Sequence, residues 1–318
     1  MITRAKIISV VLLLGLGAVP LASGNEYVLN MCCMLFLYIT LSQSWNILGG
    51  YAGQVNVGQA AFFGVGALAT RLLWTAGVPL YVSIGAGGLA SVLLAVIIGL
   101  PALRLKGHYF AIGTLAVAWI ARITVGNVLP GISFLPTRQM ATYSLVPRYY
   151  IFFAVMMGAL LTIYFVVNSR TGLGMEATRD DEDAAQTAGV DIFKYKVIAF
   201  LISSFFAGLA GACFGYFHAS YYWHLPFSLM WCFEPILIVF IGGVGTFAGP
   251  IAGSVCYVLL KEAFALTLGE MNVLIFGIVF ILTILFFPKG IIGLPSTLRE
   301  FFRKGRRPTL AAGAADDR

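Results

Sequence analysis

Charged side chains inside long apolar segments are the first residues of this sequence that could do chemistry. They are Arg71, Arg122, Glu234, Lys261 and Glu262. Such charges are costly in an apolar environment and usually mark a solute path or an ion pair. Pro235 follows Glu234 and would leave backbone carbonyl groups free one turn back, near the carboxylate. Arg122 is a possible partner for Glu234 or a contact for an anion, whereas Arg71 is expected to reach the interface as an anchor.

The sequence lacks the residue spacing of an active site. Its three histidines and five cysteines show neither metal-ligand spacing nor a disulfide framework. The phosphate-binding pattern G-x-x-x-x-G-K-[ST] is absent. We therefore expect no metal, no cofactor and no catalytic residue in this chain. Any nucleotide hydrolysis must come from another polypeptide, because polar segments of about 25 residues are too short for a soluble domain.

Composition indicates that these charges lie in a membrane. Of the 318 residues, 60% are hydrophobic and only 10% are charged, whereas a soluble domain has about 25% charged residues. A helix needs about 20 apolar residues to cross a bilayer. We predict an all-α, polytopic membrane protein of about ten transmembrane helices. The predicted spans are Ile7–Leu21, Tyr27–Leu48, Val57–Thr75, Leu80–Leu100, Tyr109–Val125, Tyr149–Asn168, Val197–Phe217, Ser228–Val244, Phe247–Leu266 and Asn272–Phe287.

The positions of the lysines and arginines predict which ends of the spans face the cytoplasm. Most of the 20 basic residues fall on the cytoplasmic side if both termini are cytoplasmic. The net charge of +7 is therefore a topology signal, and nucleic-acid binding is not expected. Residues 1–294 form the predicted transmembrane domain, with a cytoplasmic loop at 169–196 and a basic cytoplasmic tail at 295–318. The first span also resembles a signal peptide, whose removal would leave nine spans and an outside N-terminus.

A glycine-rich segment at residues 48–64 contains the amides Gln54, Asn56 and Gln59. Polar amides at membrane depth are costly unless they meet protein or a watery cavity. Interrupted helices of this kind often line the substrate path of transporters. A tight cytoplasmic turn with solvated amides fits the segment equally well.

Small residues predict close helix packing in two places. Helices in lipid associate through small side chains that allow close backbone approach. Gly245, Gly249 and Gly253 are spaced four residues apart and are expected to open the ninth span. Ala207 and Gly211 form a similar face on the seventh span.

The cytoplasmic loop carries a short predicted helix with a small-residue face. Thr178-x-x-Asp181 has the form of a capping box, and Gly189 fits the position after a helix end. Asp181, Ala184, Ala185 and Ala188 fall near one face. A short helix is poorly stable alone, so docking into a groove on a partner would explain it. The acidic run 180–183 would also suit a solvated connector.

Several motifs resemble one transporter family. Residues 183–189, Asp-Ala-Ala-Gln-Thr-Ala-Gly, resemble the coupling loop of ABC importer permeases, although the Leu-Pro element that often follows is missing. Four further segments are similar to LivM-type branched-chain amino-acid permeases. These segments are Gly50–Gly66, Leu103–Ala116, Glu234–Pro250 and Phe287–Leu294, in family order.

The resemblance implies a function and a set of partners. The chain would be the permease of a binding-protein-dependent importer in the bacterial inner membrane, with a sister permease, two ABC ATPase subunits and an extracytoplasmic solute-binding protein. ATP and magnesium would bind the ATPase subunits. The implied coupling residues are Arg179, Asp180, Asp183, Ala184, Ala185 and Gly189. The candidate pathway residues are Gln54, Asn56, Gln59, Trp119, Arg122 and Glu234.

Two departures from the family pattern leave the solute open. Gln59 stands where many members have histidine, and Trp119 stands where a glutamate is common. Branched-chain amino acids are the expected solutes, with urea or short amides as the alternative. An ion-coupled secondary transporter is a further alternative, but it would favour several carboxylates deep in the membrane.

Overall fold

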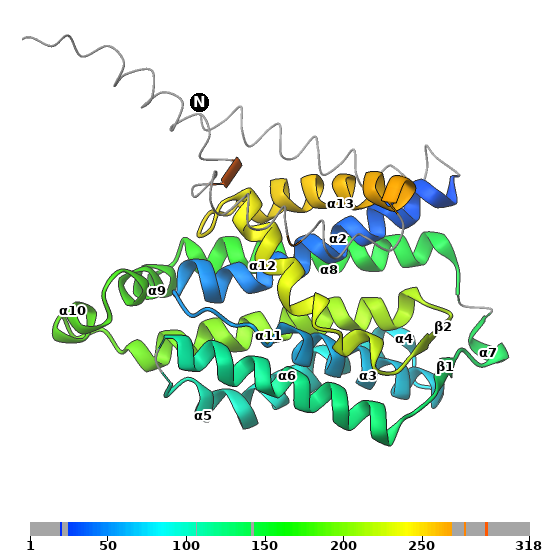
Figure 1. The fold of residues 1–318 in the computed structure, drawn as a ribbon, viewed down its shortest axis with the longest axis horizontal. Coiled ribbons are helices and arrows are strands. Elements are labelled where there is room, and N and C mark those ends of the chain that lie inside the picture. Colours follow the sequence, from blue (N-terminus) through cyan, green and yellow to red (C-terminus); the bar gives the residue numbers. More distant parts are fainter. Residues whose placement is uncertain are drawn as a thin grey trace, which may run out of the picture.

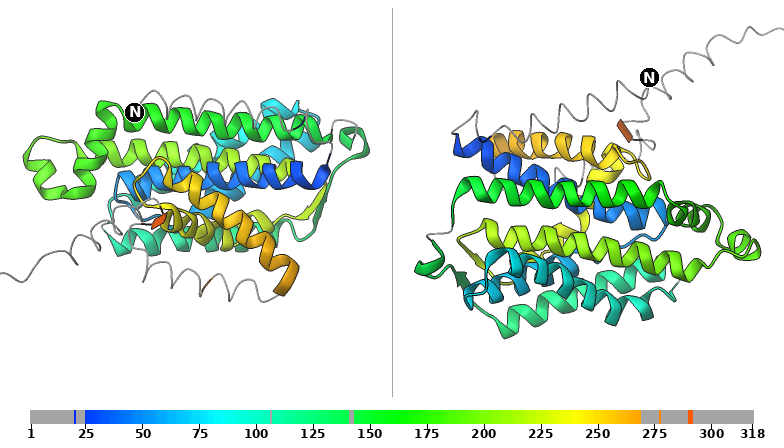
Figure 2. Two further views of the ribbon diagram at one scale, coloured as in Figure 1. Left: turned by 90° about the horizontal axis from the view of Figure 1, so that it is seen from above. Right: turned by 180° about the vertical axis from the view of Figure 1, so that it is seen from behind.

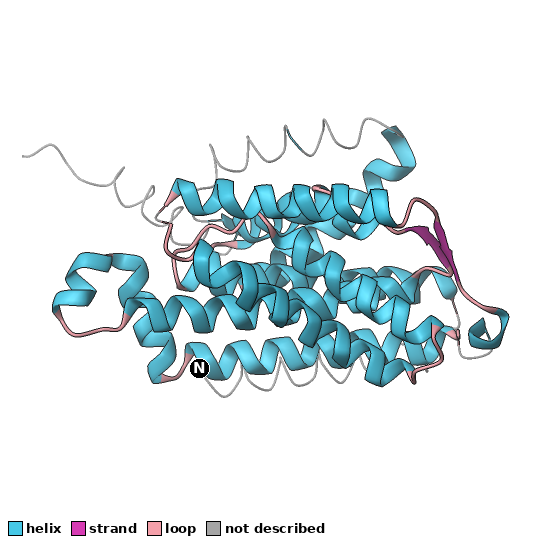
Figure 3. Cartoon of the chain, turned by 90° about the horizontal axis from the view of Figure 1, so that it is seen from below, coloured by secondary structure: helices cyan, strands magenta, loops and turns pink. Residues whose placement is uncertain are grey.

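Long helices running along one common direction make up most of the protein (Figures 1 and 3). The computed structural model describes residues 20, 25–105, 107–140, 143–268, 277 and 290–291. The predicted tenth span, nearly all of the first span and the basic tail lie outside these residues.

The long helices are α2 (Glu26–Asn46), α3 (Gln59–Thr75), α4 (Leu80–Leu94), α6 (His108–Val128), α8 (Leu145–Val167), α11 (Ile192–Phe217), α12 (Met230–Gly242) and α13 (Gly249–Leu268). The π-helical turns η1 (Ile47–Tyr51) and η2 (Ala95–Gly99) extend α2 and α4, and η2 leads into α5 (Leu100–Ala102). Short elements complete the chain: β1 (Ile132–Phe134), α7 (Thr137–Met140), α9 (Arg170–Asp180), α10 (Glu182–Thr187), β2 (Ser220–Tyr222) and the 3-10 turn η3 (Leu225–Phe227).

The described helices coincide with eight of the predicted spans. Five of these segments are long and apolar enough to cross a bilayer: Glu26–Tyr51, Leu80–Ala102, His108–Val128, Leu145–Val167 and Ile192–Phe217. The shortest of these eight helices, α12, has 13 residues, whereas the predicted span Ser228–Val244 has 17. The helix is shorter because η3 and an extended Ser228 precede it. The all-α membrane architecture is confirmed, and the total of ten spans stays a prediction.

The helix α11 lies at the centre of the bundle. It packs against α3 and α4 on one side and against α2 and α8 on the other. Small residues bring the α3 and α11 backbones together, as predicted for the Ala207 and Gly211 face. A Cβ atom on Gly211 would lie 1.8 Å from the carbonyl oxygen of Phe63. Only glycine therefore fits there, which is how helices in lipid achieve tight packing.

The bundle has two distinct ends (Figure 2). The helices α9 and α10 project from one end, here called the loop end. The antiparallel strands β1 and β2 lie at the other, the hairpin end, where Ile132 pairs with Tyr222 and Phe134 with Ser220.

Arg71 anchors the strands at the hairpin end, and its predicted role as an interfacial anchor is wrong. Its side chain is fully buried at the end of α3. The guanidinium donates to Ser133 Oγ at 2.9 Å, to the Ser133 carbonyl at 3.2 Å and to three carbonyls at the end of α11. Those three acceptors are Gly215, His218 and Ala219. A guanidinium can stay buried here because its forked donors meet this many acceptors.

Arg71→Lys is expected to lower the free energy of unfolding by about 1–3 kcal/mol. Lysine keeps the charge but offers three donors from one atom, so several carbonyls lose their partner. Thermal unfolding of the detergent-solubilised chain, followed by tryptophan fluorescence, measures the change. An unchanged unfolding midpoint would mean that the guanidinium geometry does not matter at this site.

Candidate functional site

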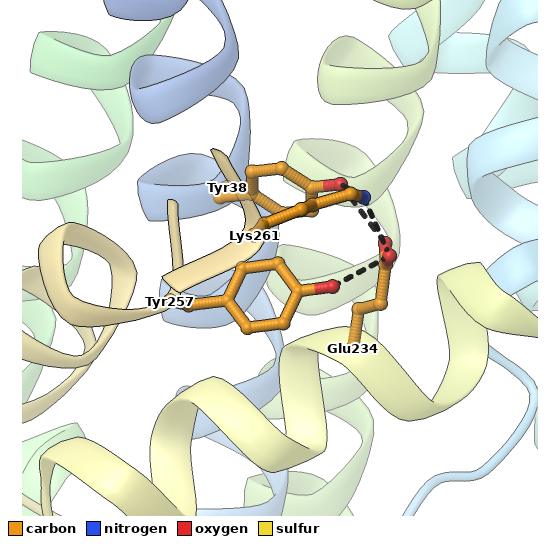
Figure 4. A network of polar contacts seen from close by, with 4 residues as sticks. All are labelled: Tyr38, Glu234, Tyr257 and Lys261. Atoms are coloured by element: carbon orange, nitrogen blue, oxygen red, sulfur yellow. Dashed lines mark hydrogen bonds and ion pairs between the residues drawn. The ribbon is translucent and has the colours of Figure 1, made fainter. Parts of the chain in front are cut away.

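Glu234 lies at the centre of a buried polar network formed by three helices (Figure 4). Its carboxylate on α12 accepts from Tyr257 Oη at 2.6 Å and Lys261 Nζ at 2.9 Å, both on α13. Tyr38 on α2 donates to the other carboxylate oxygen at 3.1 Å. The Glu234 side chain is 5% exposed, so its charge needs this ion pair and these hydrogen bonds.

The partner of Glu234 is Lys261, and the predicted pairing with Arg122 is wrong. Arg122 lies on α6, which packs on α3, α5 and η3, away from Glu234. Its guanidinium stacks 5.7 Å over the Trp119 ring one turn back. The Trp119 side chain is 44% exposed on the outer side of the bundle. Trp119 and Arg122 therefore form a separate site, and their place in a solute path stays a prediction.

The amides of the glycine-rich segment are buried, so the solvated turn is the wrong interpretation for them. Asn56 donates to Gln59 Oε1 at 2.9 Å, and Gln59 donates to Ser44 Oγ at 2.8 Å. The carbonyl of Asn56 accepts from the Trp45 indole at 2.7 Å. This network ties the segment to α2, and its role in a solute path stays a prediction.

Polar residues near the loop end of α2 were missed by the sequence analysis. Gln43 donates to the Phe247 carbonyl at 2.6 Å, and Asn46 bonds Thr246 and Gly245 at 3.0 and 2.9 Å. These bonds join α2 to the turn between α12 and α13. The sequence does contain a polar run, Ser42–Ser44, inside an apolar span, and this run could have drawn attention to these residues.

The predicted packing glycines lie at this same turn. Gly249 and Gly253 are on α13, where a Cβ on Gly253 would lie 2.1 Å from the Ile238 carbonyl oxygen of α12. Gly245 precedes the helix and has a φ of +70°, a conformation that favours glycine. Gly245 therefore shapes the turn, while the other two glycines allow α12 and α13 to approach.

Arg179 connects the loop end to the glycine-rich segment 48–64 and to the turn between α12 and α13. Its guanidinium donates to the Gly50 carbonyl at 3.1 Å and also bonds the neighbouring Asp180. A Cβ on Gly245 would lie 2.9 Å from the same guanidinium, and one on Gly53 would lie 3.0 Å from the Arg179 Cγ atom. Arg179 therefore contacts the backbone both of the glycine-rich segment and of the turn between α12 and α13.

A second connection runs through Glu182 at the start of α10. Lys196, nearly buried on α11, donates to Glu182 Oε1 at 2.6 Å. Gln54 donates to the same oxygen at 3.3 Å. The loop that carries α10, the central helix α11 and the glycine-rich segment 48–64 thus meet at one carboxylate oxygen.

The short helix in the loop exists, but its predicted cap is wrong. Asp181 itself is the N-cap of α10 and accepts from the Ala184 backbone N–H at 3.0 Å. Thr178 is inside α9, where its hydroxyl donates to the Gly174 carbonyl at 2.8 Å. The extended backbone at Asp181 separates the two helices. Gly189 follows the end of α10 with a φ of +83°, as expected for a C-terminal cap.

The exposed alanines here are Ala184 on α10 and Ala188, the residue that follows its last turn. Ala185 is 6% exposed and packs inside the chain. Asp183 and Gln186 instead line a cleft with Arg104. A contact with another protein would therefore be made by Ala184 and Ala188, with Asp180 exposed nearby.

For the importer that the sequence resemblance implies, Arg179→Lys is expected to reduce solute uptake about fivefold without changing assembly, because the contact with Gly50 would be lost. The ratio of uptake to ATP hydrolysis in proteoliposomes measures this effect. Leu173→Lys, at an exposed position of the same helix, is the matched control. Equal ratios for the wild type and Arg179→Lys would contradict transmission through Arg179.

These features define a polytopic helical membrane protein with buried polar networks and interrupted helices. Among the residues that the structure describes, no group of three or more His, Cys, Asp or Glu side chains could hold a metal ion. A family model described as "branched-chain amino acid transport system / permease component" matches residues 27–284. The chain belongs to this family and is a transport permease, not an enzyme.

Relatives with curated names agree with this family. The chain is 27% identical over 303 residues to the high-affinity branched-chain amino acid transport system permease protein LivM of Escherichia coli and to that of Salmonella typhimurium, covering 84% of this chain and 70% of each relative. It is 24% identical to a LivM of Methanocaldococcus jannaschii, covering 80% and 90%. The solved structure of PsaBC from Streptococcus pneumoniae in complex with Fab covers 84% of this chain and 90% of its own, at 13% identity and a TM-score of 0.45. That likeness is too remote to assign a fold.

Proposed function

We propose that this chain is the membrane-spanning subunit of a binding-protein-dependent ABC importer for branched-chain amino acids, driven by ATP hydrolysis in partner subunits. The observation that carries the proposal is the family match over residues 27–284, in a chain whose short helix α10 projects from one end of the bundle. A projecting helix with an exposed alanine face suits docking into a groove of an ATPase subunit.

The partners follow from this role. A sister permease would complete the membrane part, two ABC ATPase subunits would bind ATP and magnesium, and an extracytoplasmic protein would deliver the solute. The chain would lie in a bacterial inner membrane with both termini in the cytoplasm. The loop end would then face the cytoplasm, and the hairpin end would face the binding protein.

The contacts at the loop end support a mechanical role for this chain. Closure of the ATPase subunits would displace α10, and with it Glu182 and Arg179. Their contacts with Lys196, Gln54 and Gly50 would pass that movement to α11 and to the glycine-rich break. ATP and the loaded binding protein can shift the equilibrium between inward- and outward-facing states only through different affinities for the two.

Uptake into proteoliposomes tests the proposal. Leucine, isoleucine, valine and urea are compared in vesicles that contain this chain, its sister permease, the ATPase subunits and the binding protein. Uptake of a branched-chain amino acid that needs both ATP and the binding protein is the expected result. Uptake by this chain alone under an ion gradient would contradict the importer, and a preference for urea would contradict the solute.

A further inference from the structure

A cavity of about 390 Å³ lies on the hairpin-end side of the Glu234 network. The first half of α2, the last turns of α11 and the second half of α13 surround it, and Trp231 of α12 closes one side. Tyr38 and Lys261 belong both to its lining and to the network. The cavity therefore ends at the ion pair that holds α12 against α13.

The charge of Lys261 faces this cavity. Its side chain is 42% exposed, although Nζ donates to Tyr38 Oη at 2.6 Å and to Glu234 at 2.9 Å. An ammonium has three donors, so one remains beyond these two bonds. A partly exposed ammonium inside a membrane protein needs water or an anionic group beside it, because hydrocarbon cannot solvate it.

A carboxylate of this chain lines the same cavity as that ammonium. Glu262 lines the cavity and accepts a hydrogen bond from Tyr27. His218 also lines the cavity, but burial lowers its pKa, so this imidazole is neutral near pH 7. The charged groups that line the cavity are thus one ammonium and one carboxylate, on adjacent residues.

Apart from Asn30 and the tyrosines Tyr27 and Tyr38, the remaining walls are apolar. Met31 and Met34 of α2, Phe214 of α11 and Val258 of α13 line the space. Trp231 is fixed by stacking on Phe63, with ring centroids 4.3 Å apart. Aromatic walls of this kind are rigid, while methionine adapts to the shape of an aliphatic group. The volume falls in the usual range for small-molecule sites, roughly 300–1,000 Å³.

We propose that this cavity binds a zwitterionic amino acid with an aliphatic side chain. The carboxylate would bind Lys261, the ammonium would bind Glu262, and the aliphatic group would lie between the methionines and Trp231. This inference rests on the proposed function and adds a solute site inside this chain.

The site would also give the solute a means of acting on the loop end. Its carboxylate competes with Glu234 for Lys261 and so loosens the contact between α12 and α13. The turn between those helices bonds Asn46 through Gly245 and lies against Arg179. Occupation of the cavity would thereby change the same turn that α9 contacts.

Filling the cavity tests the site directly. Met34→Trp is expected to reduce leucine and isoleucine uptake at least about tenfold, because the indole takes the space of the aliphatic side chain. Alanine uptake is expected to fall less, since the smaller solute needs less room. Leu259→Trp is the matched control, because Leu259 is exposed on α13 and outside the cavity lining. Assembly and basal ATP hydrolysis are measured on the same complexes.

The outcomes separate this site from the proposed function. If the wild-type complex takes up leucine and Met34→Trp does so equally well, the cavity is not a solute site and the importer stands. If the wild-type complex takes up no branched-chain amino acid, the proposed function fails first. A phospholipid that copurifies with the wild type but not with Met34→Trp, with normal uptake in both, would make this a lipid site. Met31→Phe fills the cavity from the same helix and decides the question if Met34→Trp does not assemble.

Discussion

Glu234→Gln is expected to lower the free energy of unfolding of the assembled permease by about 2–3 kcal/mol. The substitution removes the negative charge that Lys261 contacts at 2.9 Å, so an ammonium stays in the bundle without its partner. A fully buried pair would lose about 3–5 kcal/mol, but the Lys261 side chain is 42% exposed and partly solvated. Thermal unfolding of the solubilised complex measures the loss.

The double variant Glu234→Gln with Lys261→Met is expected to recover most of that stability. With both charges gone, Tyr257 can still donate to the amide oxygen of the introduced glutamine, and Tyr38 Oη can accept from its NH2 group. The methionine side chain keeps the packing of the lysine stem. Uptake is not expected to recover, because the ammonium that faces the cavity is lost as well. If the double variant recovers both stability and uptake, the ion pair serves structure alone. If Glu234→Gln by itself is as stable as the wild type, the ion pair does not stabilise the protein.

The helices themselves were predictable because apolar length determines them. The predicted span Tyr27–Leu48 corresponds to α2 with η1, and Val197–Phe217 to most of α11. An α-helix satisfies the backbone hydrogen bonds of so long an apolar segment within the segment itself, which lipid requires. The short helix α10 was predictable in its existence and in its end, which Gly189 marks. Its start was not, because Asp181 and not Thr178 is the N-cap.

The partners of the buried charges could not be predicted from the sequence. Glu234 and Lys261 are 27 residues apart on different helices, and Arg122 was an equally reasonable partner by charge. Which helix faces which depends on tertiary packing, which the nearly uniform hydrophobicity of these helices does not reveal. The same reason applies to Arg71, whose acceptors are carbonyl groups of the α11 end and of β1.

The burial of Ala185 is a further feature that could not be predicted from the sequence. The helical period places Ala184, Ala185 and Ala188 near one face, but that face is about 100° wide and only part of it is exposed. The packing of α10 on α9 and α11 decides which alanine is buried. Ala185→Arg would therefore test folding of the loop rather than docking.

Ala184→Arg is expected to reduce ATP-driven uptake at least about tenfold while the chain still inserts and folds. The Ala184 side chain is exposed on α10, so arginine there meets no packed neighbour in this chain. In the proposed importer, a groove of the ATPase subunit that accepts a methyl group would not accept a guanidinium on a long side chain, so docking would be lost. Uptake in proteoliposomes and copurification of the ATPase subunits measure the two effects separately.

Ala184→Ser is the matched control, because serine keeps the side chain small and is expected to leave uptake within about twofold. Ala188→Arg should behave like Ala184→Arg, since both alanines are exposed on the same face. If both arginine variants bind the ATPase subunits and transport normally, α10 is a solvated connector. If Ala184→Arg binds the subunits normally but does not transport, docking uses another surface and α10 only transmits the movement.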